Sequence, residues 1–245
     1  MMIKLLATDL DGTIVRRDGS ISARVRRAFA ACQVADIQLC VATGRVKMSV
    51  APMGQEFTIC HGGTLVMQGD SILHRTAMTR EQAVRAWNWA VAREMQAVFF
   101  ADDRWFANFA GDEVASLERF LRAAPGGEPD CEVPLARLRC APSDLAADFP
   151  DLHLEHDGAW TYLRRCPADK GTALQVLMDR LGLAPDEVAC FGDENNDLPM
   201  FAVAGHRVAP ANARPGVRAQ ATRVVPGVEE DGVADFLEEL LKQYV

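Results

Sequence analysis

Short apolar runs recur near both ends of the chain, and each has about the length of one buried strand. Runs of this kind are typical of strands covered on both faces, as in a parallel sheet. The strands we expect are residues 3–7, 37–42, 57–60, 188–191, 206–209 and 223–225. The helices we expect with them are residues 23–35, 170–181, 198–202 and 233–242. This alternation predicts a doubly wound, Rossmann-like α/β core with right-handed crossovers.

The alternation of strands and helices is lost over residues 79–167. Thr79 predicts the N-cap of an amphipathic helix that extends to about Met95, with Trp87 and Val91 on one stripe. The elements we expect after it are a hairpin over 97–109, a helix over 113–123 and a second hairpin over 152–164. Helices and hairpins in this order predict a separate α+β domain over 79–167, inserted into a core made of 1–78 and 168–245.

The charge balance limits the partners that this chain can have. The 245 residues carry a net charge of −8, with a sequence pI near 5.2. An acidic surface argues against a nucleic-acid partner and against an anionic membrane surface, because both need clustered Lys and Arg. No apolar run approaches the roughly 18 residues of a membrane span, and the N-terminal run is too short for a signal peptide. We therefore expect a cytoplasmic protein, monomeric or homodimeric, that binds neither nucleic acid nor membrane.

The cysteines support the same compartment. There are seven, they include no C-x-x-C pair, and several lie inside the apolar runs expected to be strands. An odd number at scattered spacing fits reduced thiols better than a disulfide framework.

Polar residues follow several of the predicted core strands. Asp9 and Asp11 come directly after the first strand, Thr43-Gly44-Arg45 follows the second, and residues 192–197 follow the strand at 188–191. Because open α/β sheets bind ligands at the carboxyl ends of their strands, these groups are candidates for one site. Each has a simpler interpretation when taken alone. The Asp11-Gly12 pair is a common turn, and Thr43-Gly44 is a normal way to leave a strand for a helix.

Lys170 is a further candidate because of its place in a predicted helix. It opens the helix at 170–181, where a positive charge is unfavourable with the helix dipole unless an anion lies there.

Two features of the inserted domain have a functional interpretation and a simpler structural one. His153 and His156 suggest a metal pair, but no cysteine or HExxH spacing supports it, so surface or cross-strand histidines are favoured. The aromatic residues suggest a base-stacking platform, but no basic stripe accompanies them, so a hydrophobic core is favoured. These residues are Trp87, Trp89, Phe99, Phe100, Trp105 and Phe106.

The polar groups of the core, taken in order, resemble the four motifs of the haloacid dehalogenase superfamily. The segments that carry the resemblance are Asp9-Leu10-Asp11-Gly12-Thr13, Thr43-Gly44-Arg45, Lys170-Gly171 and Gly192-Asp193-x-x-Asn196-Asp197. The inserted domain lies between the second and third motifs, where it resembles, in position and size only, the type II cap of the Cof-like phosphatase branch. Glu230-Asp231-Gly232-Val233 is similar to the tail of that branch. The resemblance covers about residues 1–78 and 166–245.

Two segments depart from that branch. This chain has Gly62-Gly63-Thr64 where members commonly carry Asn-Gly-Ala, and Pro210-Ala211-Asn212-Ala213 where many carry Met-Gly-Asn-Ala. The first departure removes a group expected beside the phosphate, which bears on substrate affinity rather than on the reaction.

The acidic residues of these motifs indicate a metal site. Asp9, Asp11, Asp193 and Asp197 would converge on one sheet edge, where carboxylates repel one another and raise each other's pKa values. A hard dication relieves this repulsion, and carboxylates with water suit Mg²⁺. The resemblance implies that Asp9 and Asp193 bind it through their side chains and Asp11 through its backbone carbonyl. It places Asp197 in or beside the first shell.

The resemblance also implies the reaction. Asp9 would be the nucleophile that forms an aspartyl-phosphate, while Asp11 would protonate the leaving oxygen and later activate water. The groups expected to hold the phosphoryl oxygens are Thr43, the Gly44 amide and Lys170, with Asn196 orienting the set. The function we expect is a Mg²⁺-dependent phosphatase for a small phosphomonoester, such as a phosphosugar or phosphoglycolate.

Three alternatives remain at this point. A phosphomutase of the same superfamily would share Asp9 and Asp11, and only its products would distinguish it. A non-catalytic regulator that binds a phosphometabolite does not need a nucleophile beside an acid. Phosphonate or haloacid chemistry is disfavoured by Asp11, because an acid is useful mainly when an alkoxide leaves.

Overall fold

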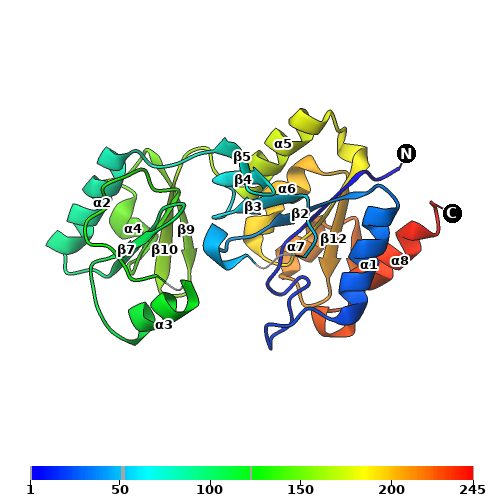
Figure 1. The fold of residues 1–245 in the computed structure, drawn as a ribbon, viewed down its shortest axis with the longest axis horizontal. Coiled ribbons are helices and arrows are strands. Elements are labelled where there is room, and N and C mark those ends of the chain that lie inside the picture. The colour runs from blue at the N-terminus through cyan, green and yellow to red at the C-terminus, as the bar shows by residue number, and fades with distance from the viewer. Residues whose placement is uncertain (1, 51–52, 122, 245) are drawn as a thin grey trace. The chain divides into compact units, whose positions relative to one another are not determined.

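The computed structural model describes residues 2–50, 53–121 and 123–244 and divides the chain into two compact units (Figure 1). The core unit holds the described residues of Met1–Gly44, Ala51–His74 and Asp169–Val245. The inserted unit holds Arg45–Val50 and those of Arg75–Ala168. Each unit has its own sheet and its own hydrophobic core.

The sheet of the core unit has eight strands among the described residues, in the order β13-β12-β11-β1-β2-β3-β4-β5. The strands from β13 to β3 run parallel, and β4 pairs antiparallel with β3. Their bounds are β1 Leu5–Thr8, β2 Gln38–Ala42, β3 Phe57–Cys60, β4 Leu65–Gln68, β5 Ser71–Arg75, β11 Val188–Phe191, β12 His206–Pro210 and β13 Arg223–Val225. The first strand in sequence, β1, therefore lies between β11 and β2 in the middle of the sheet.

Helices cover both faces of this sheet, as the predicted doubly wound fold requires. Phe191 packs edge-on against Phe29 and Phe236 on one face, whereas the preceding Cys190 belongs to the apolar cluster on the other face. Figure 1 shows α1 and α8 side by side. The helices are α1 Ala23–Val34, α5 Lys170–Leu181, α6 Leu198–Val203, α7 Pro215–Gln220 and α8 Gly232–Leu241. Short 3₁₀ helices are η2 Pro185–Glu187, η3 Asn195–Asp197 and η4 Val228–Glu230.

Side-chain caps fix the starts of two core helices. Ser22 accepts a hydrogen bond from the amide of Val25 at 3.1 Å, so α1 begins where the sequence predicts. Asp169 accepts one from Thr172 at 2.7 Å and thereby sets Lys170 as the first residue of α5.

The inserted unit is an antiparallel sheet in the order β7-β6-β8-β10-β9. The sheet packs against α2 and α4 on one face and against α3 on the other. Its strands are β6 Ala97–Phe100, β7 Trp105–Ala107, β8 Leu135–Leu138, β9 Leu152–Asp157 and β10 Trp160–Arg165. Its helices are α2 Arg80–Ala92, α3 Asp112–Leu121, α4 Pro142–Leu145 and the 3₁₀ helix η1 Lys47–Ser49. The aromatic residues singled out above are buried in these two layers, which confirms their interpretation as a hydrophobic core.

Some details of the inserted unit differ from the expectation. Thr79 caps α2 through a capping box with Gln82, but the helix ends at Ala92 and not near Met95. Val91 is 50% exposed whereas Trp87 is 7% exposed, so the two do not share a buried stripe. The central strand β8 and, in the core unit, the helix α7 are elements that the sequence pattern did not predict.

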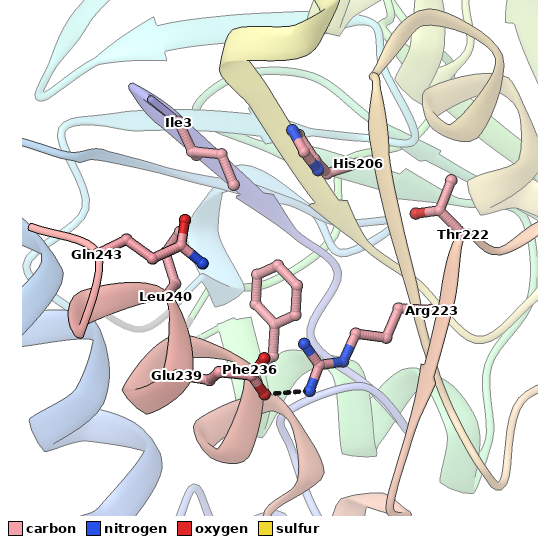
Figure 2. A pocket seen from close by; sticks show the side chains of 8 residues that line it. All are labelled: Ile3, His206, Thr222, Arg223, Phe236, Glu239, Leu240 and Gln243. Atoms are coloured by element: carbon pink, nitrogen blue, oxygen red, sulfur yellow. Dashed lines mark hydrogen bonds and ion pairs between the residues drawn. The ribbon is translucent and has the colours of Figure 1, made fainter. Parts of the chain in front are cut away.

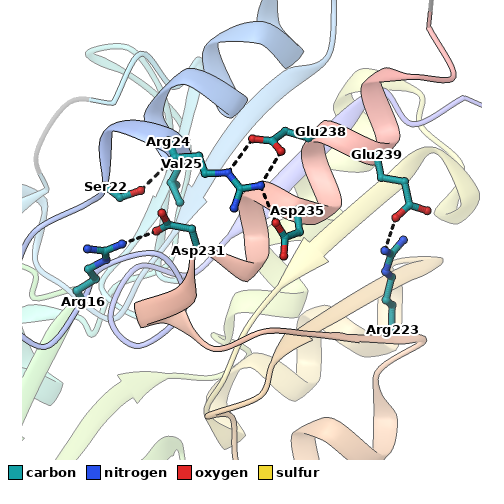
Figure 3. Close-up of polar contacts among 9 residues, drawn as sticks. All are labelled: Arg16, Ser22, Arg24, Val25, Arg223, Asp231, Asp235, Glu238 and Glu239. Atoms are coloured by element: carbon teal, nitrogen blue, oxygen red, sulfur yellow. Dashed lines mark hydrogen bonds and ion pairs between the residues drawn. The ribbon is translucent and has the colours of Figure 1, made fainter.

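Phe191 allows a test of the core packing. Phe191→Ala should lower the free energy of unfolding by about 3–5 kcal/mol, because it removes a fully buried ring that contacts both covering helices. Arg24, which forms exposed ion pairs with Asp235 and Glu238 (Figure 3), is the matched control. Arg24→Gln should leave the urea midpoint nearly unchanged, because exposed pairs are screened by water. Equal midpoints for Phe191→Ala and the parent protein would contradict this packing.

Candidate active site

Three of the polar segments lie at the carboxyl ends of neighbouring strands. Asp9 directly follows β1, and its amide donates to the carbonyl of Phe191 at 2.9 Å. Thr43 directly follows β2, and its amide donates to Ile59 at 2.8 Å. Asp193 comes two residues after β11. The parallel order of these strands therefore gathers the three segments at one edge of the sheet.

Lys170 lies among these carboxylates. Its side chain is 1% exposed, and Nζ donates to Asp9 Oδ1 at 2.6 Å and to Asp197 Oδ1 at 2.7 Å. A Cβ on Gly171 would lie 2.2 Å from the carbonyl oxygen of Pro199, so only glycine lets α5 approach α6 this closely. Lys170 lies at the start of α5, where a positive charge is unfavourable with the helix dipole. The two carboxylates beside it offset this unfavourable interaction.

Asp197 is held through both of its carboxylate oxygens. Oδ1 accepts from Lys170, and Oδ2 accepts from the amides of Asp193 at 2.9 Å and Glu194 at 3.0 Å. The side chain is fully buried. Asp197 therefore fixes both the ammonium group and the backbone that presents Asp193.

The segment after β1 meets Asp193 directly. The hydroxyl of Thr13 donates to Asp193 Oδ1 at 2.8 Å. Gly12 has a φ of +83°, and a Cβ there would lie 2.3 Å from Asp193 Oδ2. Both the positive φ and the close approach require glycine at this position.

The electrostatics of the cluster show an excess of negative charge. Burial raises the pKa of Asp9 to about 7; Lys170 opposes this shift, whereas Asp197 and Asp193 add to it. Burial likewise raises the pKa of Asp193 to about 6, against the hydrogen bond from Thr13. For Lys170, burial alone would lower the pKa, but the charges of Asp197 and Asp9 outweigh burial and raise it. One ammonium group thus does not neutralise the three carboxylates.

The same carboxylates fit a metal ion. Within the part of the chain that the structure describes, oxygens of Asp9, Asp193 and Asp197 lie within 4.8 Å of one another. Carboxylate oxygens are the donors that hard divalent cations prefer. Burial, with a smaller contribution from the neighbouring carboxylates, raises the pKa values of Asp9 and Asp193, and a cation at this point would favour their ionised forms.

The remaining predicted residues lie on the segments that follow β1, β2 and β11. Asp11 is exposed and forms an isolated bridge with Val15. Thr43 is buried, and its carbonyl accepts from Gly62 at 3.1 Å. Gly44 is exposed, and a Cβ added there would meet no atom within 4 Å. Asn196 is half-buried on η3.

Two residues, Arg214 and Thr13, make contacts at the site that were not predicted from the sequence. Arg214 donates to both oxygens of Glu194, at 3.0 and 2.9 Å, and its amide donates to the carbonyl of Asp193 at 2.8 Å. Thr13 stands inside a quoted motif, so its place after Gly12 was a signal for its bond to Asp193. Arg214 had no such signal, because charged residues on loops are common.

A pocket of about 290 Å³ lies elsewhere in the core unit (Figure 2). It lies where β1, β12 and β13 begin, whereas the acidic cluster lies where strands end. Its arginine, Arg223, already pairs with Glu239, and its His206 contacts the carbonyl of Asp186. The pocket is therefore separate from the candidate active site. The residues that line it are Ile3, His206, Thr222, Arg223, Phe236, Glu239, Leu240 and Gln243.

Comparison with known proteins gives the family. The sequence matches the model of haloacid dehalogenase-like hydrolases over residues 6–124 and 164–237. The chain belongs to this family. It is 27% identical to a 5-amino-6-(5-phospho-D-ribitylamino)uracil phosphatase of Bacillus subtilis, over 98% of each chain. It is 26% identical to a phosphoglycolate phosphatase of Methanopyrus kandleri, over 99% of each chain.

A solved structure agrees with the fold. A haloacid dehalogenase-like hydrolase from Bacteroides thetaiotaomicron has a TM-score of 0.87, with 23% identity over 97% of this chain and 99% of that chain. At this identity the likeness shows the fold alone. The predicted α/β fold is confirmed by this likeness, and the predicted superfamily is confirmed by the family match, which makes the chain a haloacid dehalogenase-like hydrolase. Within the described residues, no helix is both long and apolar enough to cross a lipid bilayer.

Lys170 provides a test of the cluster. In protein kept free of metal with EDTA, Lys170→Met should lower the free energy of unfolding by about 3–5 kcal/mol, because it leaves two buried carboxylates without their counter-charge. Urea denaturation measures this loss. Lys4→Met is the matched control, since Lys4 is 56% exposed in its pair with Glu187 and should change the midpoint little. Parental stability of Lys170→Met would mean that the ammonium group does not balance these charges.

Proposed function

We propose that this chain is a Mg²⁺-dependent phosphatase that hydrolyses a small phosphomonoester through an aspartyl-phosphate on Asp9. The observation that carries the proposal is the buried cluster in which Lys170 contacts Asp9 and Asp197 beside Asp193. Two relatives are named for a phosphoribityl compound and for phosphoglycolate, which supports a phosphosugar or a phosphoglycolate-like metabolite as substrate.

The metal ion would be held mainly by Asp9 and Asp193. Lys170 donates a hydrogen bond to Oδ1 of Asp9, and Thr13 donates one to Oδ1 of Asp193. The second oxygen of each carboxylate could therefore coordinate the ion. Asp11 would add its backbone carbonyl. Asp197, whose two oxygens already accept three hydrogen bonds, suits a place beside the first shell. When bound, the ion would supply positive charge against the phosphoryl oxygens.

The first half of the reaction transfers the phosphoryl group to the protein. A carboxylate oxygen of Asp9 attacks phosphorus, the bond from phosphorus to the substrate oxygen breaks, and Asp11 donates a proton to that oxygen. Lys170 lies against the nucleophile and favours its ionised form. In the second half, Asp11 takes a proton from water, and the resulting hydroxide attacks the aspartyl-phosphate. This step releases inorganic phosphate and restores Asp9.

The groups proposed for the phosphoryl oxygens carry donors or positive charge. Thr43 has a hydroxyl, Lys170 has an ammonium group, and Gly44 is an exposed residue with a backbone amide. These donors would stabilise the charge that spreads over the oxygens as the bond breaks. Asn196 would orient the set from η3.

The family match and the reaction products distinguish a phosphatase from the alternative functions. The match to a family of hydrolases favours a phosphatase over a mutase or a non-catalytic regulator. A phosphatase releases free phosphate, whereas a mutase returns an isomer and needs a bisphosphate primer. The cytoplasm remains the compartment we propose, because all seven cysteines are free thiols.

Metal removal tests the cofactor. EDTA should abolish phosphate release and Mg²⁺ should restore it, because the substrate and the carboxylates would otherwise repel each other. Mg²⁺ should also raise the melting temperature of the parent protein by binding only the native state. Asp193→Asn should lose most of this thermal shift. Full turnover in excess EDTA would contradict the proposed cofactor.

Substitution of the two aspartates tests the reaction. Asp11→Asn should slow phosphoryl transfer from an alkyl phosphate by about 10²–10⁴-fold, since an alkoxide leaves poorly without a proton. Transfer from p-nitrophenyl phosphate should slow far less, because nitrophenolate leaves as an anion. Hydrolysis of the aspartyl-phosphate still needs Asp11, so rapid mixing should give a burst of nitrophenolate followed by near-arrest.

The near-isosteric Asp9→Asn is the control for this experiment. It should fold normally and give neither burst nor turnover, because it lacks the nucleophile. Activity near that of the parent in folded Asp9→Asn would refute the nucleophile. Absence of a burst in folded Asp11→Asn that still binds Mg²⁺ would refute the role given to Asp11.

A further inference from the structure

The loop that carries Asp11 is compact and closed by its own backbone. We call residues 10–20 the acid loop. The carbonyl of Leu10 accepts from the amides of Ile14 at 3.0 Å and Val15 at 2.7 Å, and the amide of Gly12 donates to Val15 at 3.1 Å. Asp11 is exposed on this loop, so its side chain is not held in place by core packing. The position of the backbone that carries its carboxyl group therefore depends on how the whole loop is held.

One side chain from the far end of the chain holds the loop beside Asp11. Nδ2 of Asn212 donates to the carbonyl of Gly12 at 2.8 Å. Oδ1 of the same amide accepts from the backbone amide of Val228 at 2.8 Å. Asn212 thus joins the residue after Asp11 to the segment before α8. An asparagine can donate and accept at once, which neither aspartate nor alanine can do here.

A second contact holds the other end of the acid loop. Arg16 pairs with Asp231 at 2.8 Å (Figure 3), and the two side chains are 29% and 15% exposed. The amide of Arg17 also donates to Glu229 at 3.2 Å. The acid loop is thus held at Gly12 and again at Arg16 and Arg17, and two separated contacts resist its rotation better than one. Asp231 and Glu229, which hold the second point, lie in the segment of η4 and the start of α8.

We propose that Asn212 is a positioning residue for proton donation, and that it acts by holding the Gly12 carbonyl so that Asp11 reaches the leaving oxygen. The inference rests on the role proposed for Asp11 in the function above. A general acid must lie within hydrogen-bond distance of its target, and a displacement of about 1 Å can cost roughly 10²-fold in rate. Asn212 is itself exposed, so its removal should move the loop without opening the core.

The test compares two aryl phosphates of nearly equal size. Phenol, like the tyrosine side chain, has a pKa of about 10, whereas p-nitrophenol is a much stronger acid. Phenyl phosphate therefore needs proton donation more than p-nitrophenyl phosphate does. The value of kcat/KM reports only the steps through departure of the leaving group, so slow hydrolysis of the aspartyl-phosphate does not mask the comparison.

Asn212→Ala should raise the ratio of kcat/KM for p-nitrophenyl phosphate over phenyl phosphate by about tenfold. Asp11→Asn should raise the same ratio. Asn212→Asp keeps an acceptor for Val228 but loses the donor to Gly12, and it should raise the ratio as well. Gln175→Ala is the matched control, because it removes an exposed amide hydrogen bond, to Asp179 at 2.7 Å, that does not touch the loop. Its ratio should equal that of the parent.

The outcomes separate this inference from the proposed function. If the parent releases phosphate from neither substrate, or if Asp11→Asn leaves the ratio unchanged, the proposed function fails and the inference fails with it. If Asp11→Asn raises the ratio but the Asn212 variants leave it unchanged, only the inference is overturned. The same holds if the Asn212 variants slow the reactions of both substrates equally. Should both Asn212 variants melt at room temperature, Arg16→Gln decides by the same ratio, since it removes the second contact.

Discussion

The buried ammonium group of Lys170 is the interaction on which the rest of the core unit depends. It lies between Asp9 and Asp197, so the start of α5, the end of β1 and the 3₁₀ helix η3 meet at this point. A buried ion pair adds little net stability, because desolvation offsets the attraction, but removal of one partner is costly. Three carboxylates lie around this one ammonium group, and burial raises the pKa values of Asp9 and Asp193. A cation bound beside Lys170, as we propose, would balance the remaining negative charge.

The two aspartates of the first motif are held in different ways. Asp9 is buried directly after the central strand, with its amide bonded to β11 and its carboxylate bonded to Lys170. Asp11 is exposed on a loop that is fixed from outside by Asn212 and by the pair of Arg16 and Asp231. This difference suits the roles we propose. A nucleophile needs one fixed position, whereas an acid and base must reach first a substrate oxygen and then water.

Much of the fold and of the acidic cluster could be predicted because local pattern determined it. The core strands are apolar runs buried on both faces, and Lys170 at a helix start indicated an anion nearby. The strand β8 could not be predicted, because its short run includes Arg137 and its central place depends on pairing with β6 and β10. The contact of Asn212 with Gly12 joins residues 200 positions apart, and no local signal marks it. Val91 is exposed although Trp87, four residues earlier on α2, is buried. Helical spacing places the two on one side of the helix but does not determine which turns of that side lie against the sheet.

The most direct test of the account is to find the phosphoryl group on the protein. Asp11→Asn would be mixed with p-nitrophenyl phosphate and Mg²⁺, quenched in acid during the arrest that follows the burst, digested, and examined by mass spectrometry. The account predicts one phosphoryl group on the peptide that contains Asp9, and none in Asp9→Asn carrying the same second substitution. Release of nitrophenolate with Asp9 unmodified, or a phosphoryl group on another residue, would contradict it.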